Sequence, residues 1–144
     1  MQTTLILDTN VVLDWLVFAD PLLQPFQSAV SNQRVVLLTH PIALNELQRV
    51  LNYPNLKLSA EVAAQVMASY ASHTVAATVP EGFSNDYWLL PHGFPRCSDA
   101  DDQIFLALAY HGNAVLVSRD HAVLKLKKRA VKFGVSIIEV DQLL

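Results

Sequence analysis

The chain has 144 residues, of which 52% are hydrophobic and 16% charged, and its formal net charge is −3. This length suits one domain, residues 1–144, with a substantial core, and the net charge gives no overall sign of a polyanion binder. The single cysteine, Cys97, excludes an internal disulfide and is typical of a reducing compartment. The N-terminus lacks the basic residues of a signal peptide, and no apolar run approaches the ~18 residues that span a membrane. We therefore expect a cytoplasmic protein.

Short apolar runs alternate with helix-type patterns along the whole chain. Strands are predicted at residues 5–7, 34–38, 75–79, 114–118 and 135–140. Helices are predicted at residues 11–18, 22–31, 41–52, 59–73, 98–110 and 120–132, with Thr39 and Ser59 as caps of the third and fourth. Residues 80–97 form an irregular stretch, with one possible helical turn near Trp88. This alternation predicts an α/β fold, a three-layer α/β/α sandwich around a central parallel sheet.

Two carboxylates follow buried strands directly. Leu5-Ile6-Leu7 runs into Asp8, and the strand at residues 114–118 is followed by Asp120. Taken singly, either aspartate is explained as a helix cap, and Ser118 is an alternative cap for the second helix. In open α/β sheets, however, ligands bind outside the carboxyl ends of the strands. Both side chains are therefore candidates for a shared site.

Two more carboxylates lie on helices packed against the sheet. Glu46 sits within the apolar arc of its helix, near the edge of that arc, where a snorkelling side chain is the alternative interpretation. Asp99, Asp101 and Asp102 open the next informative helix, where the helix dipole favours acidic residues. Asp102 is the one least explained by the dipole, because its helix is apolar nearly all round. Asp99, three residues before Asp102, is close enough to share a site.

Convergence of Asp8, Glu46, Asp102 and Asp120 would be costly without a cation. Two carboxylates 4 Å apart repel by about 4 kcal/mol at an effective dielectric constant near 20. All-oxygen ligation suits Mg²⁺ or Mn²⁺. The five histidines are scattered and are predicted to be surface or packing residues.

Four stretches of the chain resemble the PIN domains, and the resemblance covers essentially its whole length. They are Leu5–Val12, Leu44–Leu51, Arg96–Ala107 and Val115–Asp120. Each is weak alone, but four in this order and spacing are fairly specific. The resemblance implies a metal-dependent ribonuclease that holds Mg²⁺ or Mn²⁺ on Asp8, Glu46, Asp102 and Asp120. It also implies supporting roles for Asn10, Asp99 and Ser118.

The branch that this chain resembles most is that of the toxins of bacterial toxin–antitoxin pairs. That similarity implies an RNA substrate, a cognate antitoxin and a homodimer, and the low content of charged residues agrees with a covered surface. Much of the family has Thr-Gly-Asp before the last carboxylate, whereas this chain has Ser118-Arg119-Asp120. Arg119 places a cation beside the site. The resemblance leaves Asp101 and Asp102 as alternatives, and the inward direction of Asp102 favours the latter.

Six of the ten basic residues lie between Arg119 and Lys132. Candidate RNA-backbone contacts are Arg119, Lys125, Lys127, Lys128, Arg129 and Lys132. The alternative for the lysines and Arg129 is an ordinary solvated helix face.

Two other functions compete with the ribonuclease. An Asp-nucleophile phosphohydrolase could begin at Asp8, but the second aspartate expected two residues later is Asn10. A non-catalytic module that binds RNA or protein is expected to lack one of the metal carboxylates, and here none of the four is missing.

Overall fold

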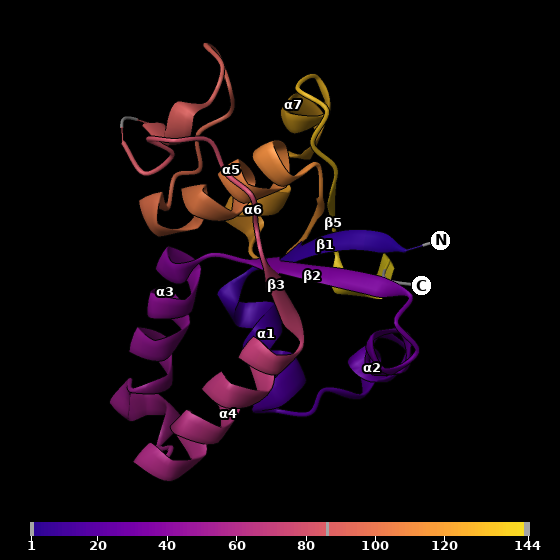
Figure 1. Ribbon diagram of the computed structural model, residues 1–144, viewed down its shortest axis with the longest axis vertical. Coiled ribbons are helices and arrows are strands. Elements are labelled where there is room, and N and C mark those ends of the chain that lie inside the picture. Colours follow the sequence, from indigo (N-terminus) through magenta and orange to yellow (C-terminus); the bar gives the residue numbers. More distant parts are fainter. Residues whose placement is uncertain (1, 86, 143–144) are drawn as a thin grey trace.

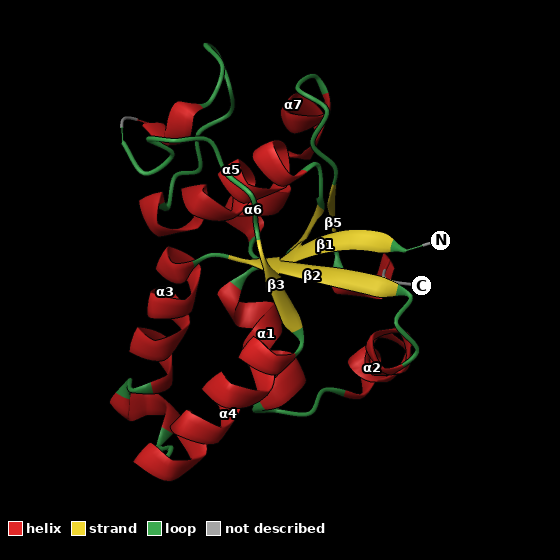
Figure 2. Ribbon diagram, viewed as in Figure 1, coloured by secondary structure: helices red, strands yellow, loops and turns green. Residues whose placement is uncertain are grey.

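Five parallel strands form the central sheet of the computed structural model, which describes residues 2–85 and 87–142 (Figure 1; Figure 2). The strand order is β3-β2-β1-β4-β5, and all four neighbouring pairs run parallel. The strands are β1 (Thr3–Leu7), β2 (Val35–Thr39), β3 (Thr74–Ala76), β4 (Val115–Val117) and β5 (Ile137–Ile138). The direction of winding reverses at β1, because β2 lies on one side of it and β4 on the other. A ligand site is expected outside the carboxyl ends of β1 and β4.

Helices cover both faces of the sheet (Figure 2). One layer contains α1 (Thr9–Leu16), α2 (Gln24–Ser31), α3 (Pro41–Leu51) and α4 (Ala60–Ser72). The opposite layer contains α5 (Gln103–Gly112), α6 (His121–Leu124) and α7 (Lys127–Val131). Short 3₁₀ helices are η1 (Pro21–Leu23), η2 (Pro54–Leu56), η3 (Tyr87–Leu89), η4 (Ala100–Asp102) and η5 (Val140–Gln142). The predicted three-layer α/β/α sandwich is confirmed.

The two layers enclose separate cores, which explains the apolar strands. Leu5 and Leu7 of β1 pack into the core beneath α1, α2 and α4, whereas Ile6 packs into the core beneath α5 and α6. Leu116 and Val117 of β4 divide between the two cores in the same way. Side chains alternate across a strand, so a stretch of strand that is covered on both faces favours apolar side chains at successive positions, as at residues 5–7.

Several predicted boundaries were wrong for local reasons. Thr39 does not cap α3, because it still pairs with Ala76 as the last residue of β2; the cap is His40, whose Nδ1 accepts the Ile42 N–H at 3.2 Å. The predicted helix at 120–132 is two helices, α6 and α7, since the Leu126 N–H bonds only three residues back, to the carbonyl of Val123. A short turn, η3, lies at the predicted place near Trp88, but it is not a regular helical turn, because the backbone of Trp88 and Leu89 is left-handed.

Two further predicted elements differ in length. The strand predicted at 135–140 is confined to Ile137–Ile138, with Val140 already in η5. The helix predicted at 98–110 starts with the 3₁₀ turn η4 and continues as α5 to Gly112. Among the described residues, each helix is too short or too polar to cross a membrane.

Candidate metal centre

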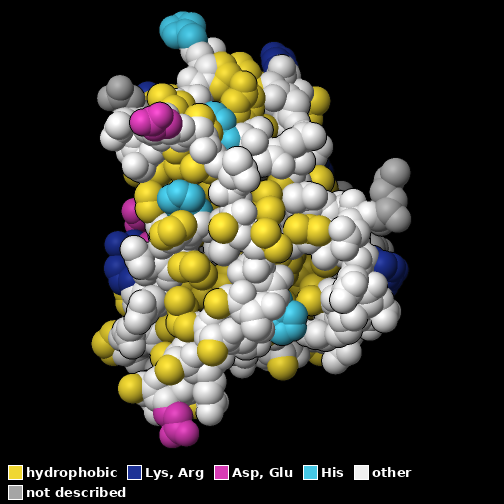
Figure 3. Space-filling view, viewed as in Figure 1, with side chains coloured by type: hydrophobic (Ala, Val, Ile, Leu, Met, Phe, Trp, Pro, Cys, Tyr) yellow, Lys and Arg dark blue, Asp and Glu magenta, His cyan; other side chains and the backbone are white. Residues whose placement is uncertain are grey.

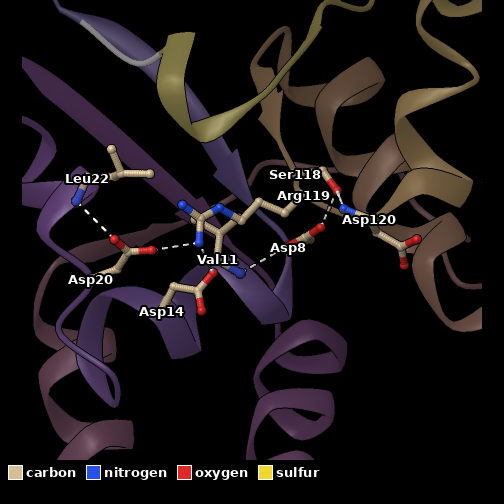
Figure 4. Close-up of polar contacts among 8 residues, drawn as sticks. All are labelled: Asp8, Val11, Asp14, Asp20, Leu22, Ser118, Arg119 and Asp120. Atoms are coloured by element: carbon tan, nitrogen blue, oxygen red, sulfur yellow. Dashed lines mark hydrogen bonds and ion pairs between the residues drawn. The ribbon is translucent and has the colours of Figure 1, made fainter.

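Asp8 and Asp120 lie at the carboxyl ends of the adjacent strands β1 and β4 and are linked through Ser118 (Figure 4). The Ser118 hydroxyl donates a short hydrogen bond to Asp8 Oδ2 and accepts the Asp120 N–H at 3.0 Å. Asp8 Oδ1 accepts the Val11 N–H at 3.0 Å, so Asp8 also caps α1. Asp120 caps α6 by accepting the Ala122 N–H at 2.9 Å. The capping role and the site role therefore coexist in both residues.

Asp99, Asp102 and Asp120 form a compact carboxylate cluster. One oxygen of each lies within 4.8 Å of the others. Asp99 precedes η4, where its side chain accepts the Asp101 N–H at 3.0 Å, and Asp102 ends that turn at the start of α5. The loop before α5 and the turn after β4 thus bring residues about 20 positions apart to one place. This cluster confirms the expected proximity of Asp99 and Asp102.

The electrostatics of the cluster favour a bound cation. Burial raises the pKa of Asp102 to about 8, helped by its contact with the Asp120 carboxyl and by the charges of Asp99, Asp120 and Asp8. Asp102 Oδ2 is buried without a hydrogen-bond partner among the described residues. Burial raises the pKa of Asp8 to about 6, against the opposing hydrogen bonds from Ser118 and Val11. A divalent cation would satisfy the orphaned oxygen and offset the repulsion.

In a comparison with models of known protein families, the model of the PIN domain matches residues 4–122 of this chain. The chain is a PIN domain. Among solved structures it is similar to the crystal structure of VapBC2 from Rickettsia felis bound to a DNA fragment from their promoter. That similarity has a TM-score of 0.63 at 15% identity and covers 95% of this chain and 98% of the other. At this identity the likeness concerns the fold. A search of curated proteins finds no match.

Glu46 of this PIN domain lies apart from the three-aspartate cluster and is held by Arg49. The Arg49 guanidinium makes a short ion pair with Glu46 and lies 3.4 Å from Asp101 Oδ2. Burial raises the pKa of Glu46, Arg49 lowers it in part, and Asp101 and Asp99 raise it again. Glu46 therefore faces the Asp99–Asp101 side of the site. Its placement as a direct metal ligand stays a prediction.

The alternatives Asp101 and Asp102 differ clearly in their surroundings. The Asp101 side chain is 65% exposed and is turned toward Arg49, whereas Asp102 belongs to the cluster. This geometry favours Asp102, as the sequence reasoning did.

Arg119 is paired with two carboxylates outside the three-aspartate cluster, Asp14 and Asp20 (Figure 4). Its Nη1 lies 2.7 Å from Asp14 Oδ2 on α1 and 2.7 Å from Asp20 Oδ2 at the cap of η1. The arginine that replaces the usual glycine therefore ties the β4–α6 turn to α1 and η1. The hydrogen bond and charge of these partners raise the pKa of Arg119.

The remaining predicted residues are more exposed. Asn10 lies in the first turn of α1 with its side chain exposed. Lys125, Lys127, Lys128, Arg129 and Lys132 are all exposed on and around α6 and α7, and Lys127 Nζ donates to Gln142 Oε1 at 3.4 Å. Their contact with RNA stays a prediction.

One buried network escaped the sequence reasoning. Gln103 Oε1 accepts the Cys97 N–H at 2.7 Å, while its Nε2 donates to the Pro95 carbonyl at 3.1 Å and to the Tyr87 hydroxyl at 3.3 Å. Arg96 stacks on the Tyr87 ring, with its guanidinium carbon 3.7 Å from the ring centroid. These contacts fix the chain that leads into Asp99. The available signal was a glutamine at the start of an otherwise apolar helix, because a buried polar side chain must find partners.

Proposed function

We propose that this PIN domain is a metal-dependent ribonuclease that hydrolyses RNA phosphodiester bonds, and that it is the toxin of a toxin–antitoxin pair. The observation that carries the proposal is the cluster of Asp99, Asp102 and Asp120 beside buried Asp8, with one Asp102 oxygen unpartnered. Four acidic side chains so placed are a costly arrangement for a purely structural purpose. Family membership supports the same function.

Asp8, Asp102 and Asp120 would hold Mg²⁺ or Mn²⁺, with Asp99 beside them and Glu46 completing the set. Such an ion, when bound, lowers the pKa of a water molecule and offsets charge on phosphate oxygens. The chain's own residues do the positioning. Ser118 fixes the orientation of the Asp8 carboxylate, and the capping bonds to the Val11 and Ala122 N–H groups hold Asp8 and Asp120 in place.

The test is cleavage of a mixture of structured and unstructured RNA by the purified chain. It is run with Mn²⁺ or Mg²⁺, with EDTA, and with the variant Asp8→Asn. An asparagine keeps an oxygen for the Val11 N–H but removes the charge. We expect cleavage with the metals and none with EDTA or with Asp8→Asn.

Glu61→Gln is the matched control, because Glu61 is an exposed carboxylate in the first turn of α4. It removes one negative charge without touching the site and should cleave like the native chain. Undiminished cleavage by Asp8→Asn would overturn the assignment of the metal site. Cleavage that persists in EDTA would overturn the metal dependence.

An antitoxin and a second copy of this chain are the proposed protein partners. Large apolar side chains are exposed at the end of α1 and on η1, α4 and β3, namely Phe18, Leu22, Val62 and Val75. Figure 3 shows hydrophobic side chains gathered on the face over α3, α4 and β3, with charged ones toward its margins. Light scattering of the purified chain tests the dimer. Co-purification with the product of the adjoining gene tests the antitoxin.

The second candidate function is a non-catalytic PIN module that binds RNA or protein in the cytoplasm. The observation that favours it is the Arg49–Glu46 ion pair, because Arg49 supplies the positive charge that a metal would otherwise bring to Glu46. RNA binding without cleavage in Mn²⁺ would support this candidate. Hydrolysis of small phosphate monoesters would instead support an Asp-nucleophile phosphohydrolase.

A further inference from the structure

A hollow of about 330 Å³ adjoins the carboxylate cluster between α3 and the start of α5. Ala100 and Asp101 line it, so it is directly next to the turn that places Asp99 and Asp102 in the cluster. Its size falls within the ~300–1,000 Å³ of small-ligand sites. Glu46, a proposed metal ligand, forms part of its wall. Otherwise the hollow has no role in the proposed metal chemistry.

The wall of the hollow includes one large aromatic ring, that of Trp88. Ile42 and Ile104 supply apolar side chains beside it. Phe83 packs against the tryptophan from within the protein, with the ring centroids 5.3 Å apart. In Figure 1 the loop that carries Trp88 lies beside α5 and above α3. The ring is thus a supported platform and not a free side chain.

The backbone that presents Trp88 is strained. Trp88 and Leu89 both have left-handed backbone angles, with φ of +54° and +52°. Bulky residues rarely adopt this region, and such outliers persist only where surrounding contacts impose them. Here the His111 Nε2–H donates to the Trp88 carbonyl at 3.0 Å, and the Leu90 N–H closes the turn onto the Tyr87 carbonyl at 3.1 Å. Backbone strain of this kind is concentrated at functional sites in proteins, which favours a functional role for Trp88.

The polar groups of the hollow suit a neutral ligand better than a phosphate. Among the described residues that line the hollow, Glu46 and Asp101 outnumber the one cation, Arg49, which is already paired with both. The Asn45 amide at the rim offers both donors and an acceptor. A planar, uncharged group with hydrogen-bonding edges fits this combination, whereas an anion would be repelled.

We infer that this hollow binds an unpaired nucleobase of the RNA, stacked on Trp88, next to the phosphate that is cleaved. The inference rests on the proposed ribonuclease function and adds to it a subsite for one base beside the metal centre. A base within a duplex is already stacked and paired and cannot enter, whereas splayed bases stack readily on aromatic side chains. Stacking of this kind corresponds to about a 5- to 160-fold change in affinity per base.

The test combines a change in the protein with a change in the RNA and asks whether their effects on affinity depend on each other. A short single-stranded oligoribonucleotide and a strand of equal length without bases are titrated in EDTA, which prevents metal-dependent cleavage. Trp88→Ala should weaken binding of the intact strand by about 5- to 160-fold and should barely affect the abasic strand. Trp88→Phe should restore most of the affinity. Glu61→Gln, at an exposed residue of α4 away from the hollow, is the control and should bind both strands like the native chain.

Equal losses for the intact and abasic strands, or no loss, would overturn the inference. Fluorescence gives a second measurement that does not need the alanine variant to fold. The chain has two tryptophans, and Trp15 is buried against Phe26 and Tyr70. Binding of the intact strand should quench the emission that Trp88→Phe removes, and unchanged emission contradicts a stacked base. If the native chain fails to cleave RNA in Mn²⁺ while this binding pattern holds, the nuclease proposal alone has failed.

Discussion

Replacing Asp102 by asparagine should stabilise the metal-free protein at alkaline pH. The carboxyl has an ordinary pKa of 3.8 and a pKa of about 8 in the folded chain, where burial dominates. Between these values the folded state binds more protons than the unfolded state, so stability falls as pH rises from about 4 to about 8. At about 1.4 kcal/mol for each pH unit, the full difference corresponds to about 6 kcal/mol. Asp102 is only partly buried, so solvent screening lowers this by roughly half, to about 3 kcal/mol.

The assay is thermal unfolding in EDTA at pH 4 and pH 9. For a chain of this length, about 3 kcal/mol corresponds to roughly 6–12 °C in Tm. Asp102→Asn should exceed the native Tm by that amount at pH 9 and by little at pH 4. Asp101→Asn removes the neighbouring exposed carboxylate and should change stability by less than about 0.5 kcal/mol. In buffer without EDTA, Mg²⁺ should raise the Tm of the native chain at pH 9 and leave that of Asp102→Asn almost unchanged. A Tm difference between Asp102→Asn and the native chain that does not vary with pH would refute the reasoning.

Three further predictions concern the surroundings of the cluster. Arg49→Met should increase Mn²⁺ affinity severalfold in calorimetry, because it releases Glu46 from its ion pair; unchanged affinity would place Glu46 outside the metal site. Gln103→Leu should lower the free energy of unfolding by about 2–4 kcal/mol in urea titrations, since it strands the buried Cys97 N–H. Arg119→Met should lower the Tm by leaving two carboxylates unpaired, and the loss should shrink in 1 M salt, which screens them. A loss that is independent of salt would show that Arg119 acts through packing.

Asp8 illustrates what the sequence can reveal. Its position was readable because an apolar strand followed at once by a capping residue is a local pattern, and parallel topology then fixes the edge of the sheet on which it lies. The same reasoning placed Asp120. Placing Asp102 required one more step. Its helix is apolar nearly all round, so the first turn of that helix was expected to direct Asp102 toward the edge of the sheet. All three inferences rest on periodicity and topology, which a single sequence carries.

Arg49 and Arg119 illustrate what the sequence could not reveal. Both are long side chains with several carboxylates in reach, and their choice of partner depends on tertiary distances. Arg119 was expected beside the metal site, but its pairing with Asp14 and Asp20 was not predicted. The strained turn at Trp88 is equally hidden, because left-handed angles at bulky residues arise from contacts with distant parts of the chain such as His111.

The hydrogen bond between Ser118 and Asp8 joins residues 110 positions apart. During synthesis on the ribosome, β1 and Asp8 emerge long before β4, and the chain must be about 120 residues long before Asp120 can reach its place. Until β4 has been synthesised, β1 has no neighbouring strand on the side away from β2, and the carboxylates of the cluster remain apart. A nascent or truncated chain that stops before β4 and Asp120 therefore cannot assemble the centre.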